Sequence, residues 1–84
     1  MNEKHMLYIL TVLKEGSFTA AAKKLYVSQP SLSQIIKAAE SNLGAPIFNR
    51  NTDPISLTPA GQLYVDAARQ ITTISTNLKK QIEE

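Results

Sequence analysis

The fold is decided by residues 16–44, which read GSFTAAAKKLYVSQPSLSQIIKAAESNLG. Two helical stretches in this segment are joined by a turn of only a few residues, centred on Tyr26-Val27. Ser17 and Ser28 precede the two stretches, and serine is a favoured N-cap because its hydroxyl accepts the unpaired N–H groups of a first turn. Two short helices with so short a connection predict a helix-turn-helix.

The second of these helices is expected over residues 28–43. Pro30 fits its first turn, where a missing N–H costs no hydrogen bond, and Gly44 suits the left-handed residue that follows a helix. Helical spacing places its apolar residues on one side, facing the core: Leu32, Ile36, Ala39 and Leu43. The opposite side carries Gln29, Pro30, Ser33, Gln34 and Lys37.

A further helix is predicted before this segment. Met6, Ile9 and Leu13 repeat at helical spacing, Asn2 is a suitable N-cap, and Gly16 ends the pattern. Because this helix is apolar almost all round, we expect it to lie in the middle of the fold.

The sequence changes character after Gly44. Residues 46–50 and 55–58 are short strand-like runs, and Asn51-Thr52-Asp53-Pro54 between them has the composition of a turn. A two-stranded hairpin, or wing, is therefore predicted. Because an isolated hairpin is marginal in water, it should pack on the helices through its apolar residues, Ile47, Phe48, Ile55 and Leu57.

The last helix is expected to start at Thr58-Pro59, an N-cap followed by proline, and to run for roughly 24 residues or about 36 Å. Its apolar positions alternate steps of four and three, as in a coiled coil: Ala60, Tyr64, Ala67, Ile71, Ile74 and Leu78. A body this small cannot cover the far end of such a helix. The sequence thus predicts a mostly α winged helix-turn-helix over residues 1–58 and a linker and dimerisation helix over residues 59–84, paired with a second subunit.

Composition sets the broad class. The chain has 84 residues, 43% of them apolar, which suits one small folded domain. It contains no cysteine, which excludes disulfides and thiolate metal sites. The N-terminus lacks the layout of a signal peptide, and no apolar run approaches a membrane span. A soluble intracellular protein, without cofactor or metal, is expected.

Charge alone does not identify a partner, because the net charge is only +2. Its distribution is more informative. Residues 1–50 carry six Lys and Arg against three acids, a net +3, whereas residues 51–84 carry three against four, a net −1. A mildly basic first part is compatible with DNA binding through that part.

The polar side of the second helix has the chemistry of a base-reading surface. In a helix-turn-helix, the second helix enters the major groove with its N-terminal residues at the base edges. Glutamine can pair with adenine, serine can donate or accept, and Pro30 offers an apolar surface for a thymine methyl. The predicted base-reading residues are Gln29, Pro30, Ser33 and Gln34.

A second set of residues is suited to the sugar-phosphate backbone. The helix N-termini capped by Ser17 and Ser28 present N–H groups that favour an anion. Thr19, Lys37 and Arg50 could hold the backbone on either side. Lys23 and Lys24 are interpreted as ordinary solvated residues.

Two other functions compete with DNA binding. Catalysis is disfavoured because His5 is the only histidine, Asp53 and Asp66 are isolated, and no nucleophile or metal-ligand motif is present. A pure protein-interaction domain stays open. It predicts no salt-dependent affinity for DNA, whereas DNA binding predicts a steep fall with salt. The exposed side of the second helix also lacks the large aromatic anchors typical of protein interfaces.

Four motifs together resemble the N-terminal domain of LysR-type transcriptional regulators. They are Ser-Phe-Thr-Ala-Ala-Ala, Ser-Gln-Pro-x-Leu-Ser, Leu-Gly-x-Pro-Ile-Phe-x-Arg and Leu-Thr-Pro-Ala-Gly, and the similarity covers essentially the whole chain. The resemblance implies a winged helix-turn-helix, dimeric through a long linker helix, that binds double-stranded DNA. By position it implies the base-reading residues named above and backbone contacts from Ser17, Thr19, Ser28, Ser31, Lys37 and Arg50.

The chain departs from the family pattern at two places that bear on DNA. Gln34 stands where the family often has a basic residue, and the wing tip carries Asp53 where basic residues are common. Recognition should therefore depend on hydrogen bonds and apolar contact. Regulators of this family also carry a C-terminal effector-binding domain, and nothing here resembles one, so an isolated domain without a ligand switch is expected. The predicted site is an interrupted palindrome with half-sites about 34 Å apart or a multiple of it.

Overall fold

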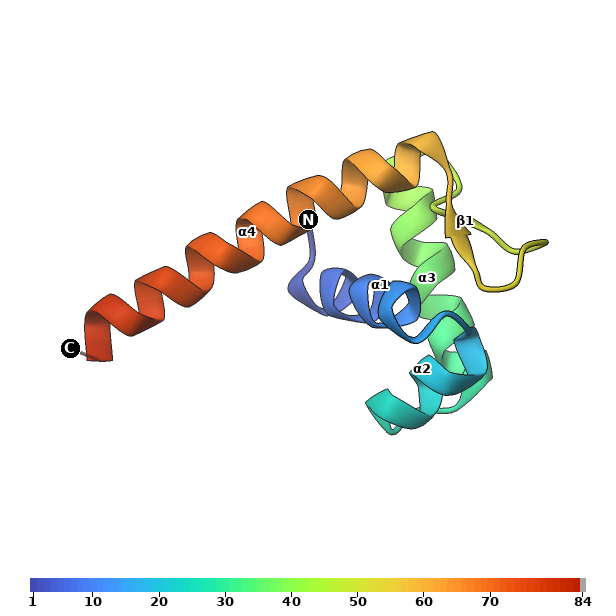
Figure 1. Cartoon of the computed structure of the whole chain (residues 1–84), viewed down its shortest axis with the longest axis horizontal. Helices are drawn as coiled ribbons and strands as arrows, with labels where there is room; N and C mark the ends of the chain where they lie inside the picture. Colours follow the sequence, from blue (N-terminus) through green and yellow to red (C-terminus); the bar gives the residue numbers. More distant parts are fainter. Residues whose placement is uncertain (84) are drawn as a thin grey trace.

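The computed structural model describes residues 1–83, and these form four helices and one two-stranded sheet (Figure 1). In chain order the elements are α1 (Glu3–Glu15), α2 (Phe18–Leu25), α3 (Gln29–Leu43), β1 (Phe48–Asn49), β2 (Ser56–Leu57) and α4 (Pro59–Glu83). The predicted fold, a mostly α winged helix-turn-helix followed by a long helix, is confirmed. No helix of residues 1–83 has the length and apolar character needed to cross a membrane.

The helix ends lie where the capping residues predict them. Asn2 accepts hydrogen bonds from the N–H groups of the first turn of α1, and Ser17 and Ser28 do the same for α2 and α3. Gly16 and Gly44 follow α1 and α3 with φ angles of 81° and 82°, in the left-handed region that only glycine adopts without strain. Local chemistry therefore determines these boundaries.

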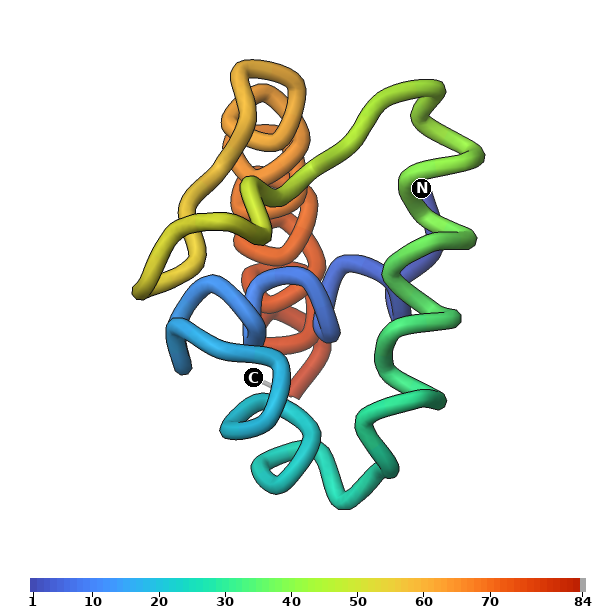
Figure 2. Tube along the Cα trace, turned by 90° about the vertical axis from the view of Figure 1, so that its right-hand side faces the viewer, coloured from blue at the N-terminus to red at the C-terminus, as the bar shows by residue number. Residues whose placement is uncertain are grey.

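The core forms around α1, which packs against α2, α3 and α4. In Figure 2, α1 begins beside α3 and crosses in front of α4, which is seen foreshortened. The central position expected for this helix is confirmed. The largest fully buried side chains come from α1, α3, α4 and the residue before β1: Ile9, Val12, Leu32, Ile36, Ile47 and Val65.

The wing is short and is held by its base. β1 and β2 pair antiparallel, with Phe48 opposite Leu57. Ile47 and Phe48 are buried, and the Phe48 ring lies edge-on to that of Phe18, with centroids 6.0 Å apart. The Ile55 N–H donates to the Gly16 carbonyl at 3.0 Å. The wing is therefore fixed to both the α1–α2 junction and the core, as its apolar pattern predicts.

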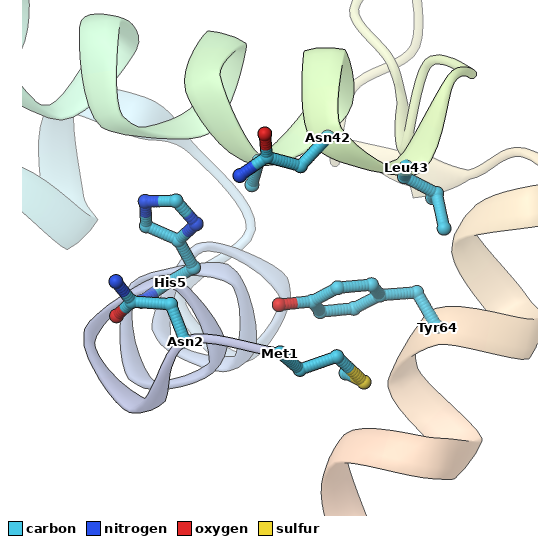
Figure 3. A pocket seen from close by; sticks show the side chains of 7 residues that line it. Met1, Asn2, His5, Asn42, Leu43 and Tyr64 are labelled. Atoms are coloured by element: carbon cyan, nitrogen blue, oxygen red, sulfur yellow. The ribbon is translucent and has the colours of Figure 1, made fainter.

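Two apolar residues lie differently from the prediction. Leu43 was expected to face the core, yet it is 41% exposed at the last turn of α3, where the chain leaves the body. Tyr64 was expected to be available to a second subunit, yet it is only 7% exposed. Its ring projects from α4 into the space between the start of α1 and the end of α3, above Met1 and beside Leu43 (Figure 3). Tyr64 thus belongs to the core of its own chain, and burial raises the pKa of its hydroxyl.

The turn of the helix-turn-helix contains a strained residue. Tyr26 follows α2 with φ 57° and ψ 40°, in the left-handed region. Its N–H closes the helix on the Ala22 and Lys23 carbonyls, but its side chain is 96% exposed. A side chain that contacts nothing does not offset the cost of this backbone conformation, which is about 1–2 kcal/mol for an L-residue.

We expect Tyr26→Asn to stabilise the domain by about 0.5–1 kcal/mol, because asparagine tolerates the left-handed region and no packing is lost. Tyr26→Val is the matched control and should destabilise the domain, since a β-branched residue tolerates positive φ less well than tyrosine does. Urea unfolding of the three proteins at one concentration measures both changes. A destabilised Asn variant would show that the phenol contributes more than its exposure indicates.

Candidate nucleic-acid interface

The polar side of α3 is open to solvent. Gln29, Pro30, Gln34 and Lys37 are exposed and Ser33 is half-buried, whereas Leu32, Ile36 and Ala39 face the core. The structure therefore places the four predicted base-reading residues on one accessible face, within the first two turns of the helix. From Gln29 to Lys37 the helix carries no acidic side chain that would repel a phosphate backbone, and Glu40, in the next turn, is paired with Arg50.

Two serines organise the start of α3. The Ser28 hydroxyl accepts from the Ser31 N–H at 3.2 Å and donates to the Ser31 hydroxyl oxygen at 2.9 Å. Because the Ser31 hydroxyl oxygen accepts this bond, its own proton is directed elsewhere, and both residues are exposed. The arrangement leaves Ser31 able to donate to an acceptor such as a phosphate oxygen.

The start of α2 lies beside the start of α3. The half-buried Ser17 hydroxyl accepts from the Ala20 N–H at 3.1 Å. Two residues on, the exposed Thr19 hydroxyl donates to Oε1 of Gln29 at 3.1 Å. This bond crosses the helix-turn-helix and joins a predicted backbone-contact residue to a predicted base-reading residue. The sequence predicts a role for each of the two residues but not the bond between them, because that bond depends on how the two helices cross.

Arg50 is held at the base of the wing. Its Nη2 donates to Oε1 of Glu40 at 3.2 Å, and its guanidinium carbon lies 4.8 Å from the centre of the Phe18 ring. The Arg50 side chain is 38% exposed, so the ion pair is screened and contributes little to stability. Glu40 engages one of the five guanidinium N–H groups. The remaining groups on the exposed side can reach a phosphate.

Glu40 holds the base of the wing, a role that the sequence did not predict. Its other carboxylate oxygen, Oε2, accepts from the Ile47 N–H at 2.8 Å. The Ile47 carbonyl accepts in turn from the N–H of Thr58 at 3.0 Å and from its hydroxyl at 3.2 Å. One residue at the base of the wing, Ile47, is thus held by α3 through its N–H and by the cap of α4 through its carbonyl. This junction sets the position of the wing, and with it that of Arg50, relative to α3.

The far part of α4 lies outside the core. Its buried residues are Gly61, Tyr64, Val65 and Ala68, and beyond Ala68 the helix extends away from the body (Figure 1). An apolar stripe, here called the α4 seam, runs along one exposed side of it. Its members, with Ala60 and Ala67 half-buried and the others exposed, are Ala60, Leu63, Ala67, Ile71, Ile74, Leu78 and Ile82. Leu63 and Ile82 were missed by the predicted heptad, and Tyr64 does not belong to it.

These features define a winged helix-turn-helix, the class of domain that places a helix in the major groove of DNA. A family model described as "Bacterial regulatory helix-turn-helix protein, lysR family" matches residues 4–62. The chain belongs to the LysR family, and it is the DNA-binding helix-turn-helix domain that this family of transcription regulators carries. The resemblance noted from the sequence motifs is confirmed.

Relatives and solved structures agree with this assignment. The chain is 37% identical over its whole length to the uncharacterized HTH-type transcriptional regulator YcgK of Bacillus subtilis, of which it covers 26%. It is 41% identical to the HTH-type transcriptional regulator BudR of Klebsiella aerogenes over 89% of this chain and 52% of that protein. The chain thus spans between a quarter and about half of the length of these curated relatives.

Among solved structures, the BenM DNA-binding domain in complex with the catB site 1 DNA matches with a TM-score of 0.90. The identity is 31%, over 99% of this chain and 89% of that one. Full-length LysG from Corynebacterium glutamicum with bound effector Arg also has a TM-score of 0.90, at 34% identity over 99% of this chain and 28% of that one.

Proposed function

We propose that this domain binds a specific DNA sequence as a homodimer, with α3 of each subunit in the major groove and an interrupted palindrome as its site. The observation that carries the proposal is the exposed, uncharged polar face at the start of α3, adjoining the two serine-capped helix N-termini. Such a face offers hydrogen-bond donors and acceptors to base edges. The free N–H groups of the helix N-termini beside it favour a phosphate.

The proposed contacts fall into two groups. Gln29, Pro30, Ser33 and Gln34 face the base edges and determine sequence preference. The other group binds sugar and phosphate and sets the register of the domain on the duplex; it consists of Ser17, Thr19, Ser28, Ser31, Lys37 and Arg50. Because Asp53 lies exposed at the wing tip, the wing contributes through Arg50 at its base.

The α4 seam supports a homodimer. An isolated helix of the length of residues 69–83 is marginal in water, so a packing partner is needed to stabilise it. A groove of about 530 Å³ also runs between α1 and α4, with Leu7, Leu10 and Ile71 among its lining residues. Leu7 is 56% exposed although it lies on the central helix. An α4 helix from a second subunit, packed against the α4 seam, would cover the apolar side chains of the seam, and its own seam would be covered in return.

Selection of bound sequences from a random DNA library, followed by salt titration on the selected site, tests this function. We expect an interrupted palindrome and an affinity that falls steeply as salt rises, because phosphate contacts release counterions. Enrichment of no sequence would contradict specific binding. Affinity independent of salt would favour the alternative, a domain that docks on protein.

Gln29→Ala should relax the preference at one position in each half-site, with a loss of discrimination of about tenfold there, since a good side-chain–base pair is worth about 1–3 kcal/mol. The same selection with the variant measures it. If all sequences were weakened equally, Gln29 would be a backbone contact. Gln70→Ala is a suitable control, because Gln70 is an exposed glutamine on α4 and remote from α3.

We further propose that response to a small molecule belongs to a part of the protein other than this domain. The solved structure of full-length LysG has a bound effector Arg, and the present chain corresponds to 28% of that chain. The proposal predicts that operator affinity of the 84-residue domain does not change with effector.

A further inference from the structure

We infer that the start of α1 makes a further contact with DNA, in which Lys4 binds the sugar-phosphate backbone on the side of α3 opposite to α2 and the wing. The inference rests on the proposed function of α3. It extends the DNA-binding surface to a helix outside the helix-turn-helix. The contact contributes to affinity and register, and not to the choice of bases.

α2 and the wing reach α3 from a single side. The Thr19 hydroxyl is hydrogen-bonded to the Gln29 side chain, and Arg50 is paired with Glu40. Gln29 and Glu40 are separated by close to three full helical turns, so their side chains project within about 20° of each other around the helix axis. The proposed phosphate contacts of Thr19 and Arg50 therefore lie on the same side of α3.

A groove lies on the other side of α3, between this helix and the start of α1. It has a volume of about 470 Å³, and both helices contribute to its walls: Lys4 and His5 from α1, Ser31 and Gln34 from α3. Ser31 and Gln34 lie about 140–200° around the helix from Gln29. Figure 3 shows the His5 ring directed from α1 toward α3. We call this space the α1–α3 groove.

A helix in the major groove has a sugar-phosphate backbone on each side, because the two strands border the groove. One backbone is within reach of the residues of α2 and the wing. The other would lie on the opposite side of α3, along the α1–α3 groove. Because Ser31 and Gln34 are proposed DNA contacts that also line this groove, the groove continues the proposed interface.

The charge of the α1–α3 groove suits a phosphate backbone. The described residues that line it include Lys4 and no acid. The Lys4 Nζ lies 5.7 Å from the centre of the Tyr8 ring, one turn along α1, and this cation–π contact restrains the long side chain at the groove. No carboxylate among residues 1–83 forms an ion pair with the Lys4 ammonium. The ammonium is therefore available to a phosphate.

Lys4→Gln removes the charge and keeps a polar side chain. For the dimer, we expect the slope of log affinity against log salt to fall in magnitude by about 2, since each lysine–phosphate contact contributes about 0.9. Selection from a random library should return the wild-type palindrome. Lys4→Arg keeps the charge and should keep the wild-type slope. Lys80→Gln is the matched control, because Lys80 is exposed in the last turn of α4, far from α3 (Figure 1).

Ethylation of single phosphates in the selected palindrome locates the contact. Ethylating a phosphate that Lys4 binds should weaken binding by the wild type and leave binding by Lys4→Gln unchanged. The same comparison with Arg50→Gln identifies the phosphates that the base of the wing contacts. We expect the two sets of phosphates to lie on the two backbones that border the same major groove in each half-site.

Three results would overturn the inference. The first is a wild-type salt slope for Lys4→Gln, and the second is a shared set of phosphates for Lys4 and Arg50. The third is a monomeric Lys4→Gln protein beside a dimeric wild type in sedimentation equilibrium, because Lys4 also lines the groove between α1 and α4 and would then act on the dimer. All three leave the wild-type palindrome in place. A wild type that enriches no sequence is a different result, since it refutes the proposed function itself.

Discussion

A Gly61→Ala variant is expected to lose about 3 kcal/mol or more of its free energy of unfolding, at the upper end of the cost of overpacking a core. A Cβ atom built at Gly61 would lie 2.0 Å from the Ile47 carbonyl oxygen and 2.9 Å from its carbonyl carbon. These are backbone atoms, and the oxygen also accepts the two hydrogen bonds from Thr58. The clash is relieved only if the base of the wing moves away from α4.

The expected loss of stability is opposite in sign to the usual effect of replacing glycine by alanine in a helix, so the measurement separates the two cases clearly. In an ordinary helix interior, glycine to alanine stabilises by about 0.5–1 kcal/mol, because alanine has the higher helix propensity. Gly44→Ala is the matched control. A Cβ atom there would have no neighbour within 4 Å, and only its φ of 82° opposes the substitution, so a loss of about 1–2 kcal/mol is expected. Urea unfolding at one protein concentration compares the variants. A Gly61→Ala protein as stable as the wild type would contradict the close approach of α4 to the wing.

The same junction illustrates what the sequence can predict. Helix boundaries follow from residues close in the chain, so Asn2, Ser17 and Ser28 at helix starts and Gly16 and Gly44 at helix ends were predictable. The role of Gly61 depends on a carbonyl fourteen positions earlier in the numbering, and that of Glu40 on the N–H of Ile47. No local pattern encodes such contacts. The only signals in the sequence that could have directed attention to them are a glycine inside the predicted last helix and the single acid of the helix over residues 28–43.

The α4 seam shows a second limit of sequence reasoning. Steps of four and three residues predict a coiled-coil stripe, and Ile71, Ile74 and Leu78 lie on it as expected. Near the start of α4, however, the helix has two apolar sides, one that faces the core and one that lies on the stripe. Tyr64 turns to the core of its own chain and Leu63, 73% exposed, takes its place on the stripe. Periodicity cannot assign neighbouring apolar residues to one side or the other, because the choice is made by the packing of α1 and α3 against the helix.

The second large effect is expected from Ile74→Glu, which should reduce affinity for the selected palindrome by on the order of 100-fold. Ile74 is 69% exposed in the single chain, so the substitution leaves the fold of each domain intact. In the proposed dimer, a glutamate would place a charge in the apolar contact between two α4 helices. Without the dimer, each half-site binds one domain, and the gain from simultaneous binding, about 10²–10⁴-fold for linked modules, is lost.

Thr73→Glu is the charge-matched control, because Thr73 is exposed and lies about 100° around the helix from Ile74. It should keep both the dimer and most of the affinity. Sedimentation equilibrium gives the mass of each variant, and titration on the full palindrome and on a single half-site gives the affinities. We expect the Ile74→Glu protein to be monomeric and to bind the two DNAs about equally. A dimeric Ile74→Glu protein, or a monomeric wild type that still prefers the full palindrome, would show that the subunits associate through a surface other than the α4 seam.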